Sequence, residues 1–171
     1  FMDSKLRTLV VCQNKGGEGK TTLTRLIAEF ASRQGLRVLL IDMDAQCNLS
    51  KRVLAMDADG ETGGAIPPIH PDYEGEANWD GRSSIADAYD ERVNLYGIVP
   101  YPTENPLIEI VPGSAKRMRT AELVNQRDVL EKITNRLKQV MGFDNWVENS
   151  YDLVVIDTPP SKGPLVQSAI R

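Results

Sequence analysis

One glycine-rich stretch near the start of the chain decides the fold: Asn14-Lys15-Gly16-Gly17-Glu18-Gly19-Lys20-Thr21-Thr22. Residues 6–12 before it are apolar and β-branched, which is typical of a buried strand. Residues 21–34 after it carry apolar side chains at helical spacing, and Gly35 stands where such a helix ends. Residues 37–42 are again apolar. A strand, a helix and a strand in this order predict a βαβ unit with a parallel sheet.

The chemistry of this stretch indicates a phosphate-binding loop. Glycines let backbone N–H groups turn toward an anion, and the start of the following helix adds partial positive charge. Lys20 has the reach to contact β- and γ-phosphates, and the Thr21 hydroxyl is suited to ligate Mg²⁺. The predicted nucleotide-binding residues are Lys15, Gly16, Gly17, Glu18, Gly19, Lys20, Thr21 and Thr22. The alternative is an ordinary glycine-rich turn with a solvated lysine.

Acidic residues end two of the predicted strands. Asp42 and Asp44 close the strand at 37–42, and Asp157 closes the apolar segment 151–157. Ligands of open α/β sheets bind at the carboxyl ends of the strands. One of Asp42 and Asp44 is then expected to hold Mg²⁺ through a water molecule. The other is expected to orient the water that attacks the phosphate. A hydrated pair of acids at a strand end is the alternative.

The remaining pattern is less regular. Residues 57–82 hold seven acids against one arginine, with five glycines and three prolines, which predicts a long surface loop or insertion without fixed regular structure. Ser83 is expected to cap a short helix that continues to Tyr89. We expect strands at 98–99 and 107–111 and a long helix over 120–141.

The glycine-rich stretch resembles the deviant Walker A family of ATPases, which includes ParA and MinD. Asn14 occupies the first glycine position of the general phosphate-loop pattern, and the additional Lys15 follows it. Residues 42–48 resemble the second motif of that family, with Ala45 in place of proline and Cys47 in place of glycine. Residues 157–161, Asp-Thr-Pro-Pro-Ser, resemble the family's Walker B and switch segment.

The resemblance implies a fold and a catalytic cycle. The fold would be an α/β P-loop NTPase, one domain over residues 1–171 with a mainly parallel twisted sheet and helices on both faces, truncated after Walker B. ATP and Mg²⁺ would be the cofactors. The implied catalytic residues are Lys15, Lys20 and Asp44, and the implied metal ligands are Thr21, Asp42 and Asp157. Lys15 would contact phosphates across an ATP-dependent homodimer. Glu18 is unusual at its position and would face solvent or a partner subunit.

The resemblance also implies partners. A ParA-like ATPase hydrolyses ATP slowly and drives plasmid or chromosome partitioning with a centromere-binding protein. Full-length members bind nonspecific DNA on the bacterial or archaeal nucleoid. The net charge of −4 predicts that residues 1–171 alone bind DNA little, with Lys116 to Arg119 as a solvated helix start. Two cysteines favour a cytoplasmic setting, and no apolar run is long enough to predict a membrane span.

Two other functions remain open. One is an ATP-dependent biosynthetic synthetase of the dethiobiotin or cobyrinic acid amide type. The other is a regulator that binds nucleotide without turnover, against which Asp44 argues.

Overall fold

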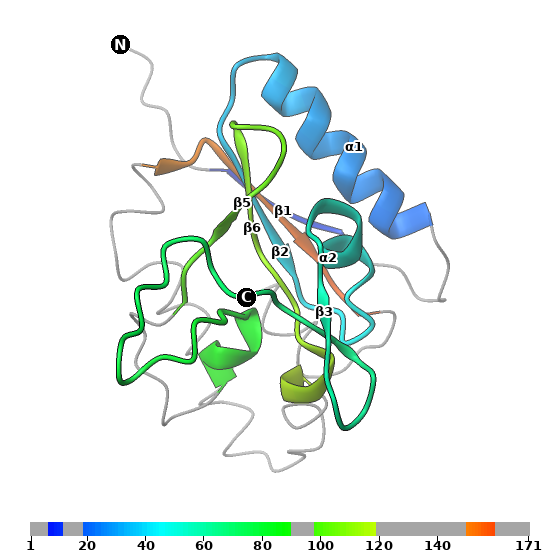
Figure 1. Cartoon of the computed structure of the whole chain (residues 1–171). Helices are drawn as coiled ribbons and strands as arrows, with labels where there is room; N and C mark the ends of the chain where they lie inside the picture. The colour runs from blue at the N-terminus through cyan, green and yellow to red at the C-terminus, as the bar shows by residue number, and fades with distance from the viewer. Residues whose placement is uncertain (1–6, 12–18, 90–97, 119–149, 160–171) are drawn as a thin grey trace.

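The structure is a computed structural model that describes residues 7–11, 19–89, 98–118 and 150–159. A five-stranded sheet lies at its centre, in the order β1-β7-β2-β6-β5 (Figure 1). The strands are β1 Arg7–Val11, β2 Val38–Asp42, β5 Tyr101–Pro102, β6 Ile108–Val111 and β7 Leu153–Asp157. All pair in parallel except β5, which runs antiparallel to β6 at the edge. The predicted parallel α/β sheet is therefore confirmed.

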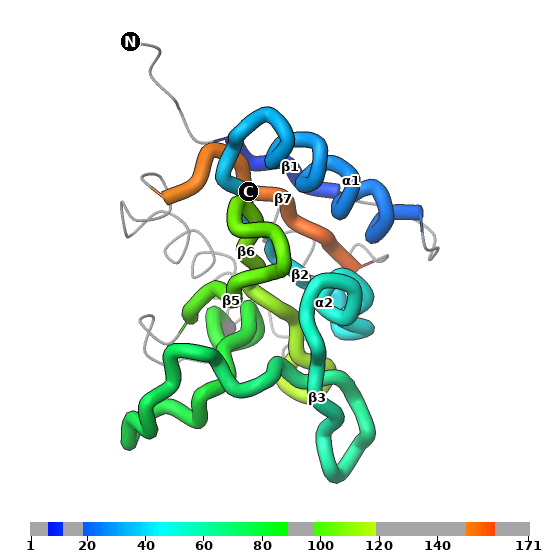
Figure 2. The backbone as a smooth tube through the Cα atoms, turned by 45° about the horizontal axis from the view of Figure 1, so that its top comes forward, coloured from blue at the N-terminus to red at the C-terminus, as the bar shows by residue number. Residues whose placement is uncertain are grey.

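The last strand lies between the first two. β7 pairs with β1 on one side and with β2 on the other, so Asp157 is the register partner of both Val11 and Asp42. The turned view shows the same order, with β7 between β1 and β2 (Figure 2). This crossover brings the ends of β1, β2 and β7 to one edge of the sheet, although the sequence separates Asp42 and Asp157 widely.

Alternating side chains of the central strands build two hydrophobic clusters. Leu40 and Val155 belong to one cluster together with Ala28 of α1, the helix Gly19–Arg33. Ile41 and Ile156 belong to the other. Successive residues of a strand point to opposite faces of a sheet, so the continuous apolar runs of β2 and β7 mean that both of their faces are covered. Asp42 and Asp157 each lie two residues beyond Leu40 and Val155, so their side chains are on the face of the sheet that α1 covers.

A short helix follows the Asp42–Asp44 motif. α2 spans Asn48–Val53, and Cys47 before it has a left-handed backbone with φ of 55°. The chain turns sharply here and returns over the end of β2. The sequence analysis did not anticipate this helix, because six residues are too few to display helical periodicity.

The acidic segment 57–82 is more ordered than predicted. Strands β3 Asp57–Ala58 and β4 Ala65–Ile66 form an antiparallel pair, and His70 is buried against the ring of Tyr101 at a centroid distance of 4.6 Å. Arg82 pairs with Asp57 across the segment at 2.6 Å. The prediction of no fixed regular structure is wrong, because ring packing and ion pairs compensate for the low apolar content. Its status as an insertion stays a prediction.

Two smaller expectations also need correction. The helix after residue 83 is a 3-10 turn, η1, Ile85–Tyr89, and its cap is Ser84 rather than Ser83. The Ser84 Oγ accepts the Ala86 N–H, and the Asp87 carboxylate accepts the Ser84 N–H, which is a reciprocal capping arrangement. The strand expected at 98–99 forms instead at 101–102 as β5.

The expected helix at 120–141 lies outside the described residues. Within the described ranges, none of the helices has the length and apolar character needed to cross a bilayer.

Candidate functional site

The start of α1 meets the end of β7 at one carboxylate. The ammonium of Lys20 lies 2.5 Å from Asp157 Oδ1, and the Thr21 hydroxyl donates to Asp157 Oδ2 at 3.0 Å. All three residues are buried, and within the described structure Lys20 Nζ and Asp157 Oδ1 make no further hydrogen bond. Burial raises the pKa of Asp157, while Lys20 and Thr21 act in the opposite direction. The structure thus joins three residues that the sequence analysis assigned to phosphate and metal binding.

Asp42 at the end of β2 has a different set of partners. Its Oδ2 accepts the backbone N–H of Ser50 at 2.9 Å and the Ser50 hydroxyl at 2.6 Å, and its Oδ1 accepts the Asp44 N–H at 3.1 Å. Burial raises the pKa of Asp42 to about 7, the negative charge of Asp157 adds to this, and the Ser50 hydrogen bonds oppose it. Both carboxylate oxygens of Asp42 therefore accept hydrogen bonds from the segment that follows β2.

Asp44 occupies the outer side of the same turn. Its Oδ1 accepts the Gln46 N–H at 2.9 Å, and its side chain is almost completely buried. The charge of Asp44 contributes to raising the pKa of Asp157, so the two carboxylates are close enough to interact. Three acids from two strand ends are therefore close enough to interact, and one of them, Asp157, contacts the first turn of α1.

The fit of Mg²⁺ can be tested on these residues. Magnesium is typically held by one or two protein oxygens together with phosphates and waters. Thr21 and Asp157 offer such hard oxygens 3.0 Å apart, so this pair fits the ion. Within the described residues, no three acidic, histidine or cysteine side chains form a protein-only metal cage. The metal roles of Thr21, Asp42 and Asp157 stay predictions, and the three hydrogen bonds to Asp42 favour a supporting role for that residue.

Several predicted site residues are not placed. Lys15, Gly16, Gly17 and Glu18 lie outside the described residues, so their phosphate contacts and the trans role of Lys15 stay predictions. Gly19 begins α1, as the predicted loop-to-helix junction requires. Thr22 follows Thr21 in the first turn of the same helix.

Sequence reasoning missed Ser50 and the ion pairs of the basic residues near 116. Ser50 lies within a short polar run that offered no pattern to single it out. Lys116 pairs with Asp59 at 3.5 Å and Glu61 at 2.9 Å. Arg117 pairs with Asp80 and Asp87 at 2.6 and 2.9 Å. The expected helix start is present, because residues 115–118 are helical and the Lys116 side chain is half exposed. The two basic side chains also anchor the acidic segment, which was not predicted. The seven acids of 57–82 were the signal that could have suggested this pairing.

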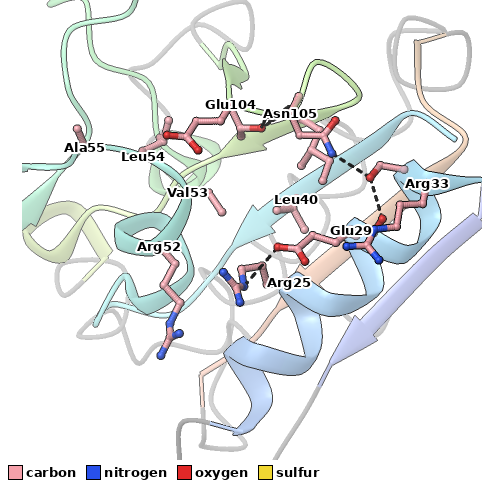
Figure 3. Close-up of a pocket in the computed structure, with 14 residues that line it drawn as sticks. Arg25, Glu29, Arg33, Leu40, Arg52, Val53, Leu54, Ala55, Glu104 and Asn105 are labelled. Atoms are coloured by element: carbon pink, nitrogen blue, oxygen red, sulfur yellow. Dashed lines mark hydrogen bonds and ion pairs between the residues drawn. The ribbon is translucent and has the colours of Figure 1, made fainter. Parts of the chain in front are cut away.

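A separate cleft lies on the α1 side of the sheet. It has a volume of about 450 Å³ and is lined by Arg25, Glu29 and Arg33 of α1, by Arg52 of α2 and by residues 103–105 (Figure 3). Arg25 pairs loosely with Glu29 at 3.6 Å within α1. None of the motif residues Lys20, Thr21, Asp42, Asp44 or Asp157 lines this cleft, so it is distinct from the candidate site.

Comparison with known proteins extends these observations. A family model described as "AAA domain" matches residues 6–171. A putative replication protein A of Rhizobium rhizogenes is 30% identical over 97% of this chain and 38% of its own length. The virulence plasmid ParA family protein pGP5-D of Chlamydia muridarum is 30% identical over 98% of this chain and 53% of its own. The chain thus spans between about a third and about half of these curated relatives.

Solved structures share the fold. A plasmid partition protein from Borrelia burgdorferi superposes with a TM-score of 0.68 at 22% identity, over 97% of this chain and 62% of its own. Cobyrinic acid a,c-diamide synthase from Mycobacterium smegmatis, solved with a bound ATP analog and magnesium, superposes with a TM-score of 0.62 at 25% identity. That match covers 96% of this chain and 55% of the synthase.

Proposed function

Because this chain belongs to the AAA-domain family of ParA/MinD-type ATPases, we propose that it binds MgATP at the junction of β1, α1 and β7 and hydrolyses it slowly. The observation that carries the proposal is the convergence of Lys20 and Thr21 on the Asp157 carboxylate. A buried ammonium whose counterion is one carboxylate is a suitable anchor for a phosphate chain, because the phosphate can take over that pairing.

Each residue then has a defined task in binding. The Lys20 ammonium would exchange Asp157 Oδ1 for the phosphates of ATP, and the partial positive charge of the α1 N-terminus would favour the same anion. Thr21 and Asp157 would hold Mg²⁺ with oxygen ligands, and the ion would neutralise negative charge on the phosphates.

Hydrolysis needs a water placed in line with the γ-phosphate. Asp44 is the residue that we assign to this task, since it stands at the outer end of the β2 edge and near Asp157. Asp42 supports the turn that carries it. Phosphoryl transfer depends mainly on alignment and charge stabilisation, so a positioned carboxylate is sufficient without being a strong base.

The wider cycle follows the family resemblance. We propose an ATP-dependent homodimer in which Lys15 contacts the partner's nucleotide. In this cycle a centromere-binding protein and nonspecific DNA act as partners in plasmid or chromosome partitioning. The relatives that support this proposal are about twice as long as this chain or longer, so these roles are assigned to the complete polypeptide.

A biosynthetic synthetase is the second candidate. It is supported by the likeness to the M. smegmatis synthase, whose structure contains an ATP analog and magnesium. The two functions differ in what ATP cleavage requires. A partitioning ATPase turns over ATP alone or with DNA and its partner, whereas a synthetase needs an acceptor acid.

The test is a titration of the purified protein with MgATP, followed by a phosphate-release assay without any acceptor acid. Lys20→Ala is the companion variant, and it is expected to lose MgATP binding because the anchored cation is gone. Unchanged MgATP affinity in Lys20→Ala would contradict the phosphate-loop assignment. Turnover that appears only when an acceptor acid is added would favour the synthetase.

A further inference from the structure

We propose that Ser50 is a positioning residue for hydrolysis, which fixes Asp42 and through it the turn that carries Asp44. The proposal rests on the ATPase activity proposed above. Ser50 belongs to α2 and touches neither Lys20 nor Thr21 through any hydrogen bond in the described structure. It therefore acts on the reaction through another residue.

The Ser50 hydroxyl joins three elements. It donates to Asp42 Oδ2 at the end of β2 at 2.6 Å, and it accepts the Gly113 N–H just after β6 at 3.0 Å. The Ser50 N–H donates to the same Asp42 oxygen at 2.9 Å. A hydroxyl has one proton to donate, and here that proton is committed to the carboxylate. Since Ser50 is fully buried, water cannot replace these bonds without opening the structure.

The chain of bonds continues to the proposed catalytic residue. Asp42 Oδ1 accepts the Asp44 N–H at 3.1 Å, and Asp44 Oδ1 accepts the Gln46 N–H at 2.9 Å. One oxygen of Asp42 is thus fixed by Ser50, while the other holds the backbone of Asp44. A displacement of the Asp42 carboxylate therefore alters a hydrogen bond that holds the Asp44 backbone.

The close approach of Gly113 shows that this joint is tightly packed. A Cβ at this position would lie 3.1 Å from Cys47 Sγ and 3.2 Å from the carbonyl oxygens of Asp42 and Asp44. The segment after β6 therefore packs directly against the backbone of the turn that carries Asp44. The Gly113 N–H donates to the Ser50 hydroxyl. The Ser50 hydroxyl thus links the segment after β6 to the turn that carries Asp44.

A purely structural role makes a different prediction. If Ser50 only stabilised the start of α2, its loss would lower the free energy of unfolding and leave the turnover of the folded molecules unchanged. If Ser50 positions Asp44, its replacement lowers kcat. MgATP affinity is then preserved, because Lys20 and Thr21 are not touched.

The experiment compares Ser50→Ala with the matched control Ser32→Ala in the full-length natural polypeptide. Ser32 is also a buried serine whose hydroxyl both donates, to the Glu29 carbonyl at 2.8 Å, and accepts, from the Asn105 amide at 3.0 Å. It lies at the far end of α1 from Lys20. For each variant the MgATP affinity, the kcat and the melting temperature are measured.

We expect kcat to fall about 10- to 100-fold in Ser50→Ala, as for a small misplacement of a reacting group, with MgATP affinity within about threefold of wild type. Ser32→Ala should keep its kcat even where its melting temperature falls equally. Ser50→Thr, which retains the hydroxyl, should recover most of the rate. If Ser50→Ala does not fold, Ser50→Cys replaces it, because a thiol is a weaker donor of similar size, and a reduced kcat is again expected.

An unchanged kcat in a folded Ser50→Ala or Ser50→Cys protein overturns the proposal, and so does an equal loss of kcat in Ser32→Ala. A wild-type protein that binds MgATP but shows no turnover contradicts the proposed ATPase function instead. The two failures are therefore distinguished by the wild-type assay alone.

Discussion

Asp42 and Asp157 are register partners on the adjacent parallel strands β2 and β7, and both carboxylates are fully buried at the same edge of the sheet. The structure accommodates these two acids in different ways. Asp157 has the Lys20 ammonium as its counterion, whereas the hydrogen-bond donors to Asp42 among the described residues are neutral groups of Ser50 and Asp44. Burial together with the neighbouring charge raises the pKa of Asp42 to about 7.

This difference predicts a pH-dependent stability. The unfolded pKa of Asp42 is near 3.8 and the folded one is about 7, so the folded state holds one more proton between these values. Stability therefore declines as pH rises through this window, by at most about 1.4 kcal/mol per unit from this group, and levels off above pH 7. Denaturant unfolding without Mg²⁺ should show that Asp42→Asn removes much of this slope. An identical slope in the variant would contradict the assignment to Asp42.

Arg117 should matter for stability more than Lys116. Arg117 pairs with Asp87, which is buried, and with Asp80 in the acidic segment. Arg117→Ala leaves the Asp87 carboxylate buried without its cation, and we expect a loss of about 1–3 kcal/mol. Lys116→Ala removes an exposed ammonium whose pairs are screened by water, and it should therefore cost less than Arg117→Ala. Chemical denaturation compares the two, and equal effects would mean that the Asp87 pair is not important.

DNA binding by residues 1–171 alone is expected to be weak. The chain has a net charge of −4, and the cations of Lys116 and Arg117 are neutralised by acids of the segment 57–82 and by Asp87. Affinity for duplex DNA depends on cations that are free to displace counterions from phosphates. Fluorescence anisotropy near physiological salt should therefore show little binding, with or without ATP. Tight binding that weakens steeply with salt would show that this chain carries a DNA surface.

Lys15 is expected to act across a dimer. Family resemblance places this lysine at the phosphates of the neighbouring subunit, whereas Lys20 serves its own site. In the full-length polypeptide, Lys15→Ala should retain MgATP binding by the monomer but lose ATP-dependent dimerisation and hydrolysis. Sedimentation with and without ATP measures the first effect. A normal ATP-dependent dimer in the variant would make Lys15 a local phosphate contact.

The sequence predicted the parts of the fold that depend on local pattern. The run of residues 37–42 and the spacing over 21–34 led to β2 and α1 within one or two residues, because buried strands and amphipathic helices have a distinct periodicity. The positions of Asp42 and Asp157 at the ends of two strands were correctly predicted, whereas their functional roles stay predictions. That Asp42 and Asp157 stand side by side was not predicted, because strand order depends on long-range pairing.

The errors arose where long-range contacts override composition. The segment 57–82 has the low apolar content of a disordered loop, yet Lys116, Arg117 and the ring of Tyr101 hold it in place from elsewhere in the chain. The partners of Asp42 were likewise hidden, because Ser50 lies eight residues away on a helix too short to leave a pattern. The sequence showed that 57–82 is acidic and that 116–117 is basic, but it did not show that the two segments are in contact.

The last prediction is that Asp44 serves hydrolysis rather than binding. Lys20 and Thr21, the proposed MgATP contacts, lie on α1 and meet Asp157, whereas the Asp44 carboxylate accepts a hydrogen bond within its own turn. Removing Asp44 therefore leaves those contacts in place. We expect Asp44→Ala to bind MgATP with nearly wild-type affinity and to accumulate the ATP-bound dimer in the full-length polypeptide. Its turnover should fall by about 100-fold or more, because an unaligned water attacks slowly.

Asp44→Asn separates the charge of Asp44 from its structural bond. The amide oxygen of asparagine can still accept the Gln46 N–H, so the turn keeps its shape while the negative charge is lost. If the carboxylate orients the water, Asp44→Asn should be almost as slow as Asp44→Ala, and both should bind MgATP in a calorimetric titration. If Asp44→Asn hydrolyses ATP at the wild-type rate, the residue acts only by shaping the turn. If Asp44→Ala is also unimpaired, another group must orient the attacking water, and Asp42 is the nearest candidate on the same strand end.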